Sequence, residues 1–137
     1  MTGRDHGFDV VVINYRGLAG VKLKTPKMFC CDSWQDVLEP MTHVYNQYKK
    51  DRMYFAIGCS MGGNILGNLL GYEGKNTFIE AACVVQAPIK NWECETSVRS
   101  ALCGFYDRAF GRNIFNIYLE NEPILKNHVK SVTKIDI

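Results

Sequence analysis

The sequence of 137 residues contains no apolar stretch near the roughly 18 to 20 residues that are needed to span a bilayer. Its N-terminus lacks a basic region followed by an apolar core, so it does not resemble a secretory signal. The formal net charge is only +2, which is too small for the concentrated basic face of a nucleic-acid-binding protein. These absences predict a soluble protein that does not bind nucleic acid.

The chain also lacks a C-x-x-C spacing, although it contains six cysteines. Cys59, Cys83 and Cys103 lie in apolar segments, and Cys30 and Cys31 are neighbours. This distribution favours buried free thiols in a reducing, cytoplasmic compartment over disulfides or a zinc site, so no metal is expected. With 47% hydrophobic and 22% charged residues, the composition is that of one globular domain.

Strand and helix patterns alternate along the first 90 residues. Ser33 and Asp36 form a predicted capping box at the start of the first helix, and Pro40 is expected to kink this helix or to restart it. The alternation predicts an α/β fold with a parallel sheet and helices on its faces. In chain order, we expect a buried strand at 8–13, a loop at 15–32, a helix after 33, a strand at 54–57, a helix from 61 to about 71 and a strand at 81–85.

Beyond Pro88 the pattern changes to helices, expected at 92–110 and 113–135. The last helix has an apolar stripe and a basic stripe. The basic stripe is predicted to be a solvated helix face, with contact to a membrane surface as the less favoured alternative. The apolar stripe comprises Leu125, Val129 and Val132, and the basic stripe comprises Lys126, Lys130 and Lys134.

A serine between glycines joins the second strand pattern to the helix that follows. Ser60 stands two positions after Gly58 and two before Gly62, with Gly63 next, a pattern typical of a nucleophile elbow. Such a turn holds the serine oxygen clear of the backbone, where a base can activate it. The amide of Met61 is then expected to donate to an oxyanion at the start of the helix.

Two other interpretations of this segment are an unreactive small-residue turn and a phosphate-binding glycine loop. The glycine loop fits poorly, because the segment has neither a lysine followed by serine or threonine nor the G-x-G-x-x-G spacing. The strand before Ser60 and the helix after it favour the nucleophile elbow.

Three segments together resemble successive motifs of one α/β-hydrolase branch: Val12–Gly20, Leu23–Pro26 followed by Cys30 and Cys31, and Gly58–Asn64. This branch includes medium-chain fatty-acid ethyl ester synthase/esterases, monoacylglycerol lipases, a phospholipase and embryogenesis-associated hydrolases. The resemblance implies a partial α/β-hydrolase fold, with a sheet core at 1–90 and a helical cap region at 91–137. It also implies hydrolysis of medium-chain acyl esters or acylglycerols by Ser60, without a cofactor.

The resemblance further implies that part of the catalytic apparatus lies outside this sequence. In the family, a His-Gly loop supplies the second oxyanion amide, and the acid and base follow two later strands. Among the histidines, neither His6 nor His43 nor His128 occupies such a position. Asp32, Asp36 and Asp107 match no triad role either. We therefore expect the chain alone to be inactive.

In the family, a strand that precedes residue 1 separates the strand expected at 8–13 from the elbow strand. The unfilled position leaves backbone groups without partners on both sides. This favours an alternative from another class, a non-catalytic hydrolase-fold subunit or binding module that takes its missing strands from a partner chain. A second enzymatic alternative is acyl transfer to an alcohol.

Overall fold

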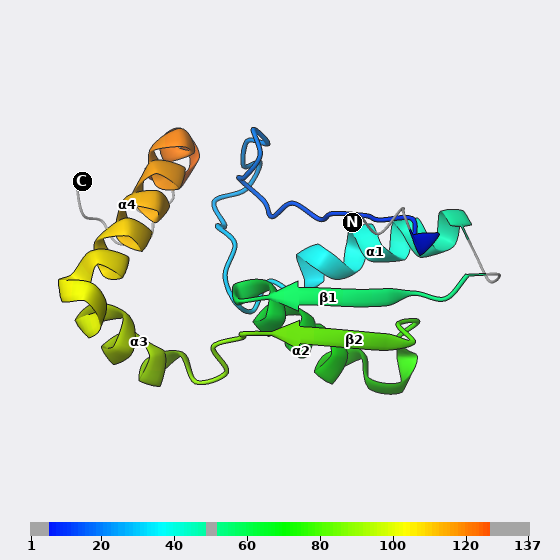
Figure 1. Cartoon of the computed structure of the whole chain (residues 1–137). Helices are drawn as coiled ribbons and strands as arrows, with labels where there is room; N and C mark the ends of the chain where they lie inside the picture. Colours follow the sequence, from blue (N-terminus) through cyan, green and yellow to red (C-terminus); the bar gives the residue numbers. More distant parts are fainter. Residues whose placement is uncertain (1–5, 49–51, 127–137) are drawn as a thin grey trace.

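The computed structural model describes residues 6–48 and 52–126. Its elements confirm the predicted α/β class, with a parallel sheet and flanking helices (Figure 1). Residues 122–126 are also helical. In chain order the elements are α1 (Gln35–Tyr48), β1 (Phe55–Cys59), α2 (Met61–Glu73), η2 (Gly74–Asn76), β2 (Ala81–Val85), α3 (Asn91–Ser100), η3 (Ala101–Gly104) and α4 (Phe105–Glu120).

The sheet of the described residues consists of β1 and β2, which are parallel and joined by α2. The register runs from the Phe55–Ala81 pair to the Cys59–Val85 pair. The pairing continues past β1, because the Ser60 amide donates to the Val85 carbonyl at 2.9 Å. Both strands therefore end at the same edge of the sheet, and Figure 1 shows this edge directed toward α3 and α4.

The core lies between the sheet and the helices α1 and α2. Leu66 and Leu69 of α2 pack with Ile79 just before β2, and Leu69 is 0% exposed. Half-buried side chains of α1 and β1 surround this cluster, which removes apolar area from water and so provides the main stabilisation. They include Val37, Leu38, Met41 and Ala56, and Trp34, just before α1, packs there as well.

The described residues leave most of the other face of the sheet uncovered. Side chains alternate between the faces, so Phe55 and Ile57 point away from α2, and Ile57 is 80% exposed. Cys83 lies opposite Ile57 in the register and is exposed as well. Parallel sheets are usually covered on both faces, so this apolar face is an uncommon feature.

The predicted strand at 8–13 is wrong, because these residues have no regular structure and Val12 is 78% exposed. The segment does approach β1 at one end. The Phe8 and Phe55 rings meet edge to face at 6.2 Å, and Asp9 pairs with Arg52. A strand also needs a ladder of backbone hydrogen bonds, and among the described residues no neighbouring strand provides one for this segment.

The predicted capping box is also wrong. Ser33 is 1% exposed, and its hydroxyl accepts a hydrogen bond from the Cys30 amide at 2.9 Å, within the preceding loop. The Asp36 carboxylate binds the Arg16 guanidinium through both oxygens. A charged partner with two donors outcompetes the single backbone amide of a capping box. Helix α1 runs through Pro40 as one element.

The six cysteines are free, as predicted, but the prediction that they are buried is wrong. Cys31 and Cys94 are half-buried, and the other four are exposed. Cys59 and Cys83 are exposed because they lie on the uncovered face of the sheet, where the sequence pattern predicted a covering layer.

The helical region after residue 90 breaks earlier than predicted. Leu102 and Cys103 have left-handed φ values of 48° and 54°, and they separate α3 from α4, which runs through the expected break near 111–112. Lys126 of the predicted basic stripe pairs with Glu122 at 3.4 Å. The other members of the two stripes, except Leu125, lie outside the described residues. No described helix has the length and apolar character required to cross a membrane.

The Arg16–Asp36 pair predicts a stability that depends on pH. Arg16 hydrogen bonds hold the pKa of Asp36 below its ordinary value of 3.8. A depressed folded-state pKa stabilises the protein above the unfolded value and loses this effect as pH falls through the folded value. We expect Asp36→Asn to lower the free energy of unfolding at pH 7 by about 1 kcal/mol.

Urea titrations of the unsubstituted chain and of Asp36→Asn at several pH values measure the difference between their free energies of unfolding. It should shrink as pH falls below 3.8 and vanish below the folded-state pKa. Asp32→Asn is the matched control, because exposed Asp32 has no ion-pair partner among the described residues. Equal effects of the two substitutions at neutral pH would contradict the proposed role of the pair.

Candidate active site

Ser60 occupies a sharp bend between β1 and α2. Its φ and ψ angles are 54° and −124°, a sparsely populated combination for a residue with a side chain. Such strain typically costs about 1 to 3 kcal/mol and is concentrated at functional sites. The Ser60 carbonyl accepts the first helical hydrogen bond, from the Gly63 amide at 2.9 Å. Ser60 is exposed, so its hydroxyl lies at the surface of the bend.

The bend needs glycine at two positions because backbone segments approach closely there. A Cβ atom on Gly58 would lie 2.4 Å from the Gly62 carbonyl oxygen. A Cβ atom on Gly63 would lie 2.8 Å from the Ala87 Cβ atom and 3.1 Å from Val84 Cγ1. These contacts hold the start of α2 against the ends of β1 and β2.

Tyr15, the first residue of the loop at 15–32 (the long loop), lies next to the same bend. Its hydroxyl would lie 2.8 Å from a Cβ atom on Gly62, and its ring stacks on Phe29 with 5.6 Å between the centroids. Burial, together with the nearby Cys31 thiol, raises the pKa of the Tyr15 hydroxyl above its ordinary value. The hydroxyl therefore remains a neutral hydrogen-bond donor at neutral pH.

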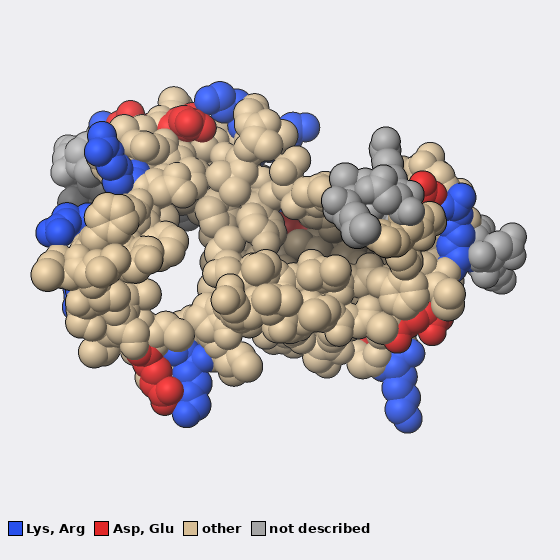
Figure 2. Space-filling view, in the orientation of Figure 1, with Lys and Arg blue, Asp and Glu red and all other residues tan. Residues whose placement is uncertain are grey.

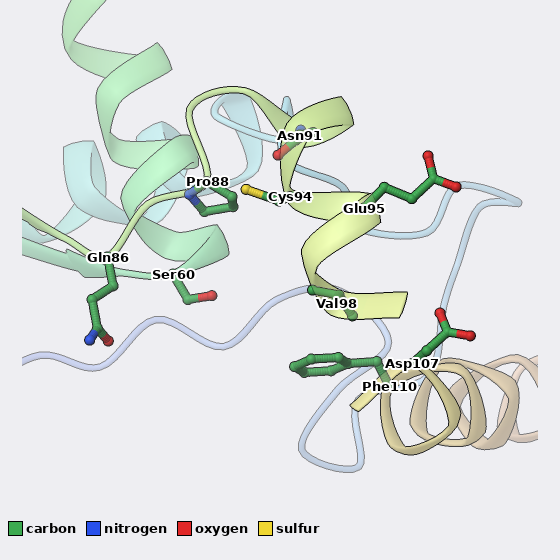
Figure 3. Close-up of a pocket in the computed structure, with 9 residues that line it drawn as sticks. All are labelled: Ser60, Gln86, Pro88, Asn91, Cys94, Glu95, Val98, Asp107 and Phe110. Atoms are coloured by element: carbon green, nitrogen blue, oxygen red, sulfur yellow. The ribbon is translucent and has the colours of Figure 1, made fainter. Parts of the chain in front are cut away.

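Ser60 opens into a cavity of about 430 Å³, which we call the Ser60 pocket. Figure 3 shows the Ser60 hydroxyl and the Phe110 ring directed into it, whereas Glu95 points away. Glu95 also pairs with Arg99 at 3.2 Å. The residues that line the pocket are Ser60, Gln86, Pro88, Asn91, Cys94, Glu95, Val98, Asp107 and Phe110.

Met61, the next residue, lines a second cavity of about 590 Å³, which we call the Met61 pocket. It lies between the bend, the long loop and α4. In Figure 2 a hollow separates the helical arm of α3 and α4 from the rest of the chain. The residues that line the Met61 pocket are Tyr15, Leu18, Ala19, Gly20, Phe29, Met61, Phe110, Asn113, Ile114, Ile117 and Glu120.

Asn121 follows α4 and forms hydrogen bonds that join this end of the helical arm to the loop at 15–32, beside the Met61 pocket. Asn121 is 4% exposed, and its side-chain oxygen accepts a hydrogen bond from the Leu23 amide at 3.0 Å. Its side-chain nitrogen donates to the Ile117 carbonyl at 2.9 Å. Lys22 donates to the Glu120 carbonyl at 3.1 Å beside it. At the other end of the arm, Asn64 of α2 donates to the Pro88 carbonyl at 3.0 Å.

The structure brings together only some of the titratable residues considered from the sequence. Asp107 lines the Ser60 pocket, but neither described histidine does. His6 lies in the exposed N-terminal segment, His43 lies on α1, and His128 lies outside the described residues. Asp32 is an exposed loop residue, and Asp36 binds Arg16. In the described part of the chain, no cluster of three potential metal ligands occurs.

Most residues that line the Ser60 pocket were not predicted from the sequence. Gln86 could have been found, because it directly follows β2 and parallel strands end at the same edge of a sheet. Its φ value of 51° is a second sign of a constrained site. Phe110 carries no comparable signal in the sequence, because only the path of α4 brings it opposite Ser60.

A parallel sheet, a strained serine bend at its carboxyl edge and the helix that follows define a class, the α/β-hydrolases, here with a partial fold. Comparison with known proteins supports the same class. Phospholipase ABHD3 of Mus musculus is 34% identical over an alignment of 134 positions, which covers 96% of this chain and 30% of that protein. Medium-chain fatty acid ethyl ester synthase/esterase 2 of Saccharomyces cerevisiae is 33% identical over 112 residues, 81% of this chain and 24% of that protein.

Monoacylglycerol lipase of Saccharomyces cerevisiae is 25% identical over an alignment of 142 positions, which covers 95% of this chain and 31% of that protein. These matches confirm the predicted resemblance, and the chain is a relative of this α/β-hydrolase branch. It spans between 24% and 31% of the length of these three relatives. No protein-family model and no solved structure matches the chain.

The close approach at the bend predicts opposite effects for two glycine substitutions. Gly58→Ala should lower the free energy of unfolding by about 3 kcal/mol, because the new methyl group meets backbone that cannot move aside. Gly67→Ala in the middle of α2 should raise it by about 0.5 to 1 kcal/mol, because no atom lies within 4 Å and alanine favours helix. Urea denaturation followed by circular dichroism measures both changes. Similar effects of the two would contradict the close approach.

Proposed function

We propose that this chain forms the nucleophile-bearing part of a serine ester hydrolase. The observation that supports it most is the strained, exposed bend at Ser60 opening into a pocket of about 430 Å³. A strained backbone is maintained where it serves chemistry, and an unreactive turn gains nothing from it. The relatives, which bear the names phospholipase, esterase and monoacylglycerol lipase, support the same class of reaction.

In this proposal, the Ser60 oxygen attacks the carbonyl carbon of an acyl ester while a base takes the hydroxyl proton. The Met61 amide, at the start of α2, donates a hydrogen bond to the oxyanion that forms. Collapse of this intermediate expels the alcohol, which receives the proton, and leaves an ester on Ser60. Water then releases the acid and restores the serine.

The base, the acid and a second oxyanion donor are proposed to come from outside this chain. No histidine of the described residues lines the Ser60 pocket, and this supports a base supplied from elsewhere. We propose medium-chain acyl esters or acylglycerols as substrates, which the names of the relatives support. The free cysteines support a reducing, cytoplasmic environment.

A chimera tests this function by supplying the missing parts. The chain would replace the matching segment of mouse phospholipase ABHD3, to which it is 34% identical. We expect a fluorophosphonate probe to label Ser60 in the chimera and not in the isolated chain. We also expect ester hydrolysis that falls by about a thousandfold or more in Ser60→Ala, because the nucleophile is removed.

Two controls make the result decisive. Circular dichroism and a cooperative thermal transition show whether the chimera is folded. Cys59→Ala is the matched variant beside Ser60, and it should keep the labelling. A folded chimera that neither labels nor hydrolyses esters would refute the proposed function. Strong labelling of Ser60 in the isolated chain would show instead that the chain contains its own base.

The uncovered sheet favours the alternative function, a non-catalytic subunit that accepts strands from a partner chain. The edge of β1 away from β2 has no hydrogen-bonded neighbour among the described residues. Phe55 and Ile57 on the adjoining face are exposed. An open strand edge next to apolar side chains is a common docking site for another strand.

Light scattering after size-exclusion chromatography tests strand acceptance. If the edge of β1 accepts strands, the purified chain should form a dimer or a larger assembly, and Ile57→Lys should shift it toward the monomer because a charge disfavours edge pairing. Val11→Lys, at a similarly exposed apolar residue outside the sheet, is the control. A folded monomer of the unsubstituted chain would count against strand acceptance.

A further inference from the structure

We propose that the outer face of α4 binds the surface of an anionic lipid bilayer. This face is a row of three apolar and two basic residues, which we call the outer stripe. It lies away from the Ser60 pocket, and its binding to lipid needs no reaction there, so the inference goes beyond the proposed function. The outer stripe comprises Phe105, Arg108, Arg112, Phe115 and Leu119.

The outer stripe follows from the spacing of its residues along α4. Its members are three or four positions apart, so they lie above one another on the same side of the helix. The residues of α4 that line the two pockets form a second such row. At about 100° per residue, the two rows lie on opposite sides of the helix, and the outer stripe is directed away from both pockets. The second row comprises Asp107, Phe110, Asn113, Ile114, Ile117 and Glu120.

Every member of the outer stripe is exposed. Phe105 is 59% exposed, Phe115 57% and Leu119 48%, and both arginines are exposed as well. The Phe115 ring stacks on the ring of Tyr118, the third residue after it, with 6.3 Å between the centroids, and still remains exposed. A row of large apolar side chains that stays in water indicates a surface that binds a partner.

Charge is segregated across α4. Its basic residues, Arg108 and Arg112, both belong to the outer stripe, and neither pairs with a carboxylate among the described residues. Its acidic residues, Asp107 and Glu120, are among the pocket-lining residues instead. In Figure 2 the side of the helical arm away from the hollow carries Lys or Arg side chains (blue). The outer stripe is therefore positive and complements a surface that is rich in phosphate or carboxylate groups.

Aromatic and basic side chains that alternate along one face suit the boundary between lipid headgroups and acyl chains. The rings of Phe105 and Phe115 leave water when they enter this boundary, while the long arginine side chains extend back to the headgroups. A guanidinium binds a phosphate group through two N–H donors at once. Both contributions require a helix that lies flat on the bilayer, and the outer stripe runs along nearly the whole length of α4, as this orientation needs.

The size of the outer stripe favours a bilayer over a protein or a nucleic acid. The stripe spans about 21 Å of one helix, so its area is on the order of 300 Å². Each partner in a stable protein interface contributes about 800 Å². Figure 1 shows α3 and α4 as a curved arm, and the stripe lies on its outer side. A fluid bilayer takes up single side chains there, whereas two arginines neutralise too few phosphates for stable binding of a nucleic acid.

Sedimentation of the whole chain with sucrose-loaded vesicles tests this binding. The vesicles contain phosphatidylcholine alone, or phosphatidylcholine with one quarter phosphatidylserine, at neutral pH and about 0.1 M salt, where exposed charges interact over about 10 Å. We expect binding to the phosphatidylserine vesicles to be at least tenfold stronger, because each arginine contributes about a factor of five at an anionic surface. Salt of about 1 M should remove most of this preference, since it screens the charges.

Two adjacent residues of α4 provide variants that are matched in charge and exposure. Phe115→Glu should weaken binding to phosphatidylserine vesicles at least tenfold, because it removes an apolar ring and repels the headgroups. Ile114→Glu adds the same charge in the Met61 pocket, at a residue that is 55% exposed against 57% for Phe115. It should leave binding within about threefold, since the charge lies across the helix from the bilayer. Circular dichroism checks that both variants are folded.

A second pair of variants removes one positive charge each. Arg112→Gln takes the charge from the outer stripe and should weaken binding about fivefold. Lys75 is exposed and lies in η2, which precedes β2 at the end of the strands opposite to the edge directed toward α3 and α4. Lys75→Gln should therefore leave binding within about twofold.

The outcomes separate lipid binding from its alternatives. Failure to bind phosphatidylserine vesicles, equal weakening by the two glutamate variants, or equal weakening by the two glutamine variants would overturn the proposal. If the outer stripe binds a second copy of the chain instead, the vesicles would remain unbound, and light scattering would show that Phe115→Glu, unlike Ile114→Glu, shifts an assembly toward the monomer.

Lipid binding is also separable from the proposed function. An active chimera with Ser60-dependent labelling, together with vesicles that remain unbound by the chain, would support the hydrolase and refute the lipid surface. Vesicle binding that depends on Phe115 and Arg112, together with a folded but inactive chimera, would support the lipid surface and refute the hydrolase.

Discussion

The close approach of the end of β1 to the start of α2 is the constraint on which the candidate site depends. Because Gly58 has no side chain, the Gly62 carbonyl can lie within 2.4 Å of the position that a Cβ atom would take. The chain must reverse within a few residues to achieve this contact. The reversal falls on Ser60, which adopts a positive φ and turns its side chain out of the sheet.

The sequence predicted the elements that local and sequential interactions determine. β2 lies at Ala81–Val85 as expected, because its apolar run ends at a turn and pairs with a strand one helix earlier. The expected strand at 8–13 has an equally apolar pattern and yet no strand forms. An apolar run becomes a strand only beside a hydrogen-bonding neighbour, and periodicity does not reveal whether that neighbour is present.

The difference between local patterns and contacts of distant segments also explains how much of the site could be predicted from the sequence. The serine, its glycines and the following amide form one continuous motif, so their relation was evident from spacing alone. The pockets depend on contacts between distant segments, such as the bond from the Leu23 amide to the Asn121 side chain. Phe110 lies opposite Ser60 because this bond and the Asn64–Pro88 bond hold the two ends of the helical arm. Neither bond has a signature in the sequence.

The serine bend is therefore a local unit, whereas the pockets beside it depend on distant segments of the chain. β1, α2 and β2 supply the contacts that hold Ser60 in its strained conformation: the packing of Gly63 against Val84 and Ala87 and the bond from the Ser60 amide to Val85. The strain of about 1 to 3 kcal/mol is offset within this unit, although the sheet has an uncovered face. In the proposed function, the base approaches from another part of a larger fold. The proposed nucleophile is thus held in place by residues 55–87, although no described histidine lines its pocket.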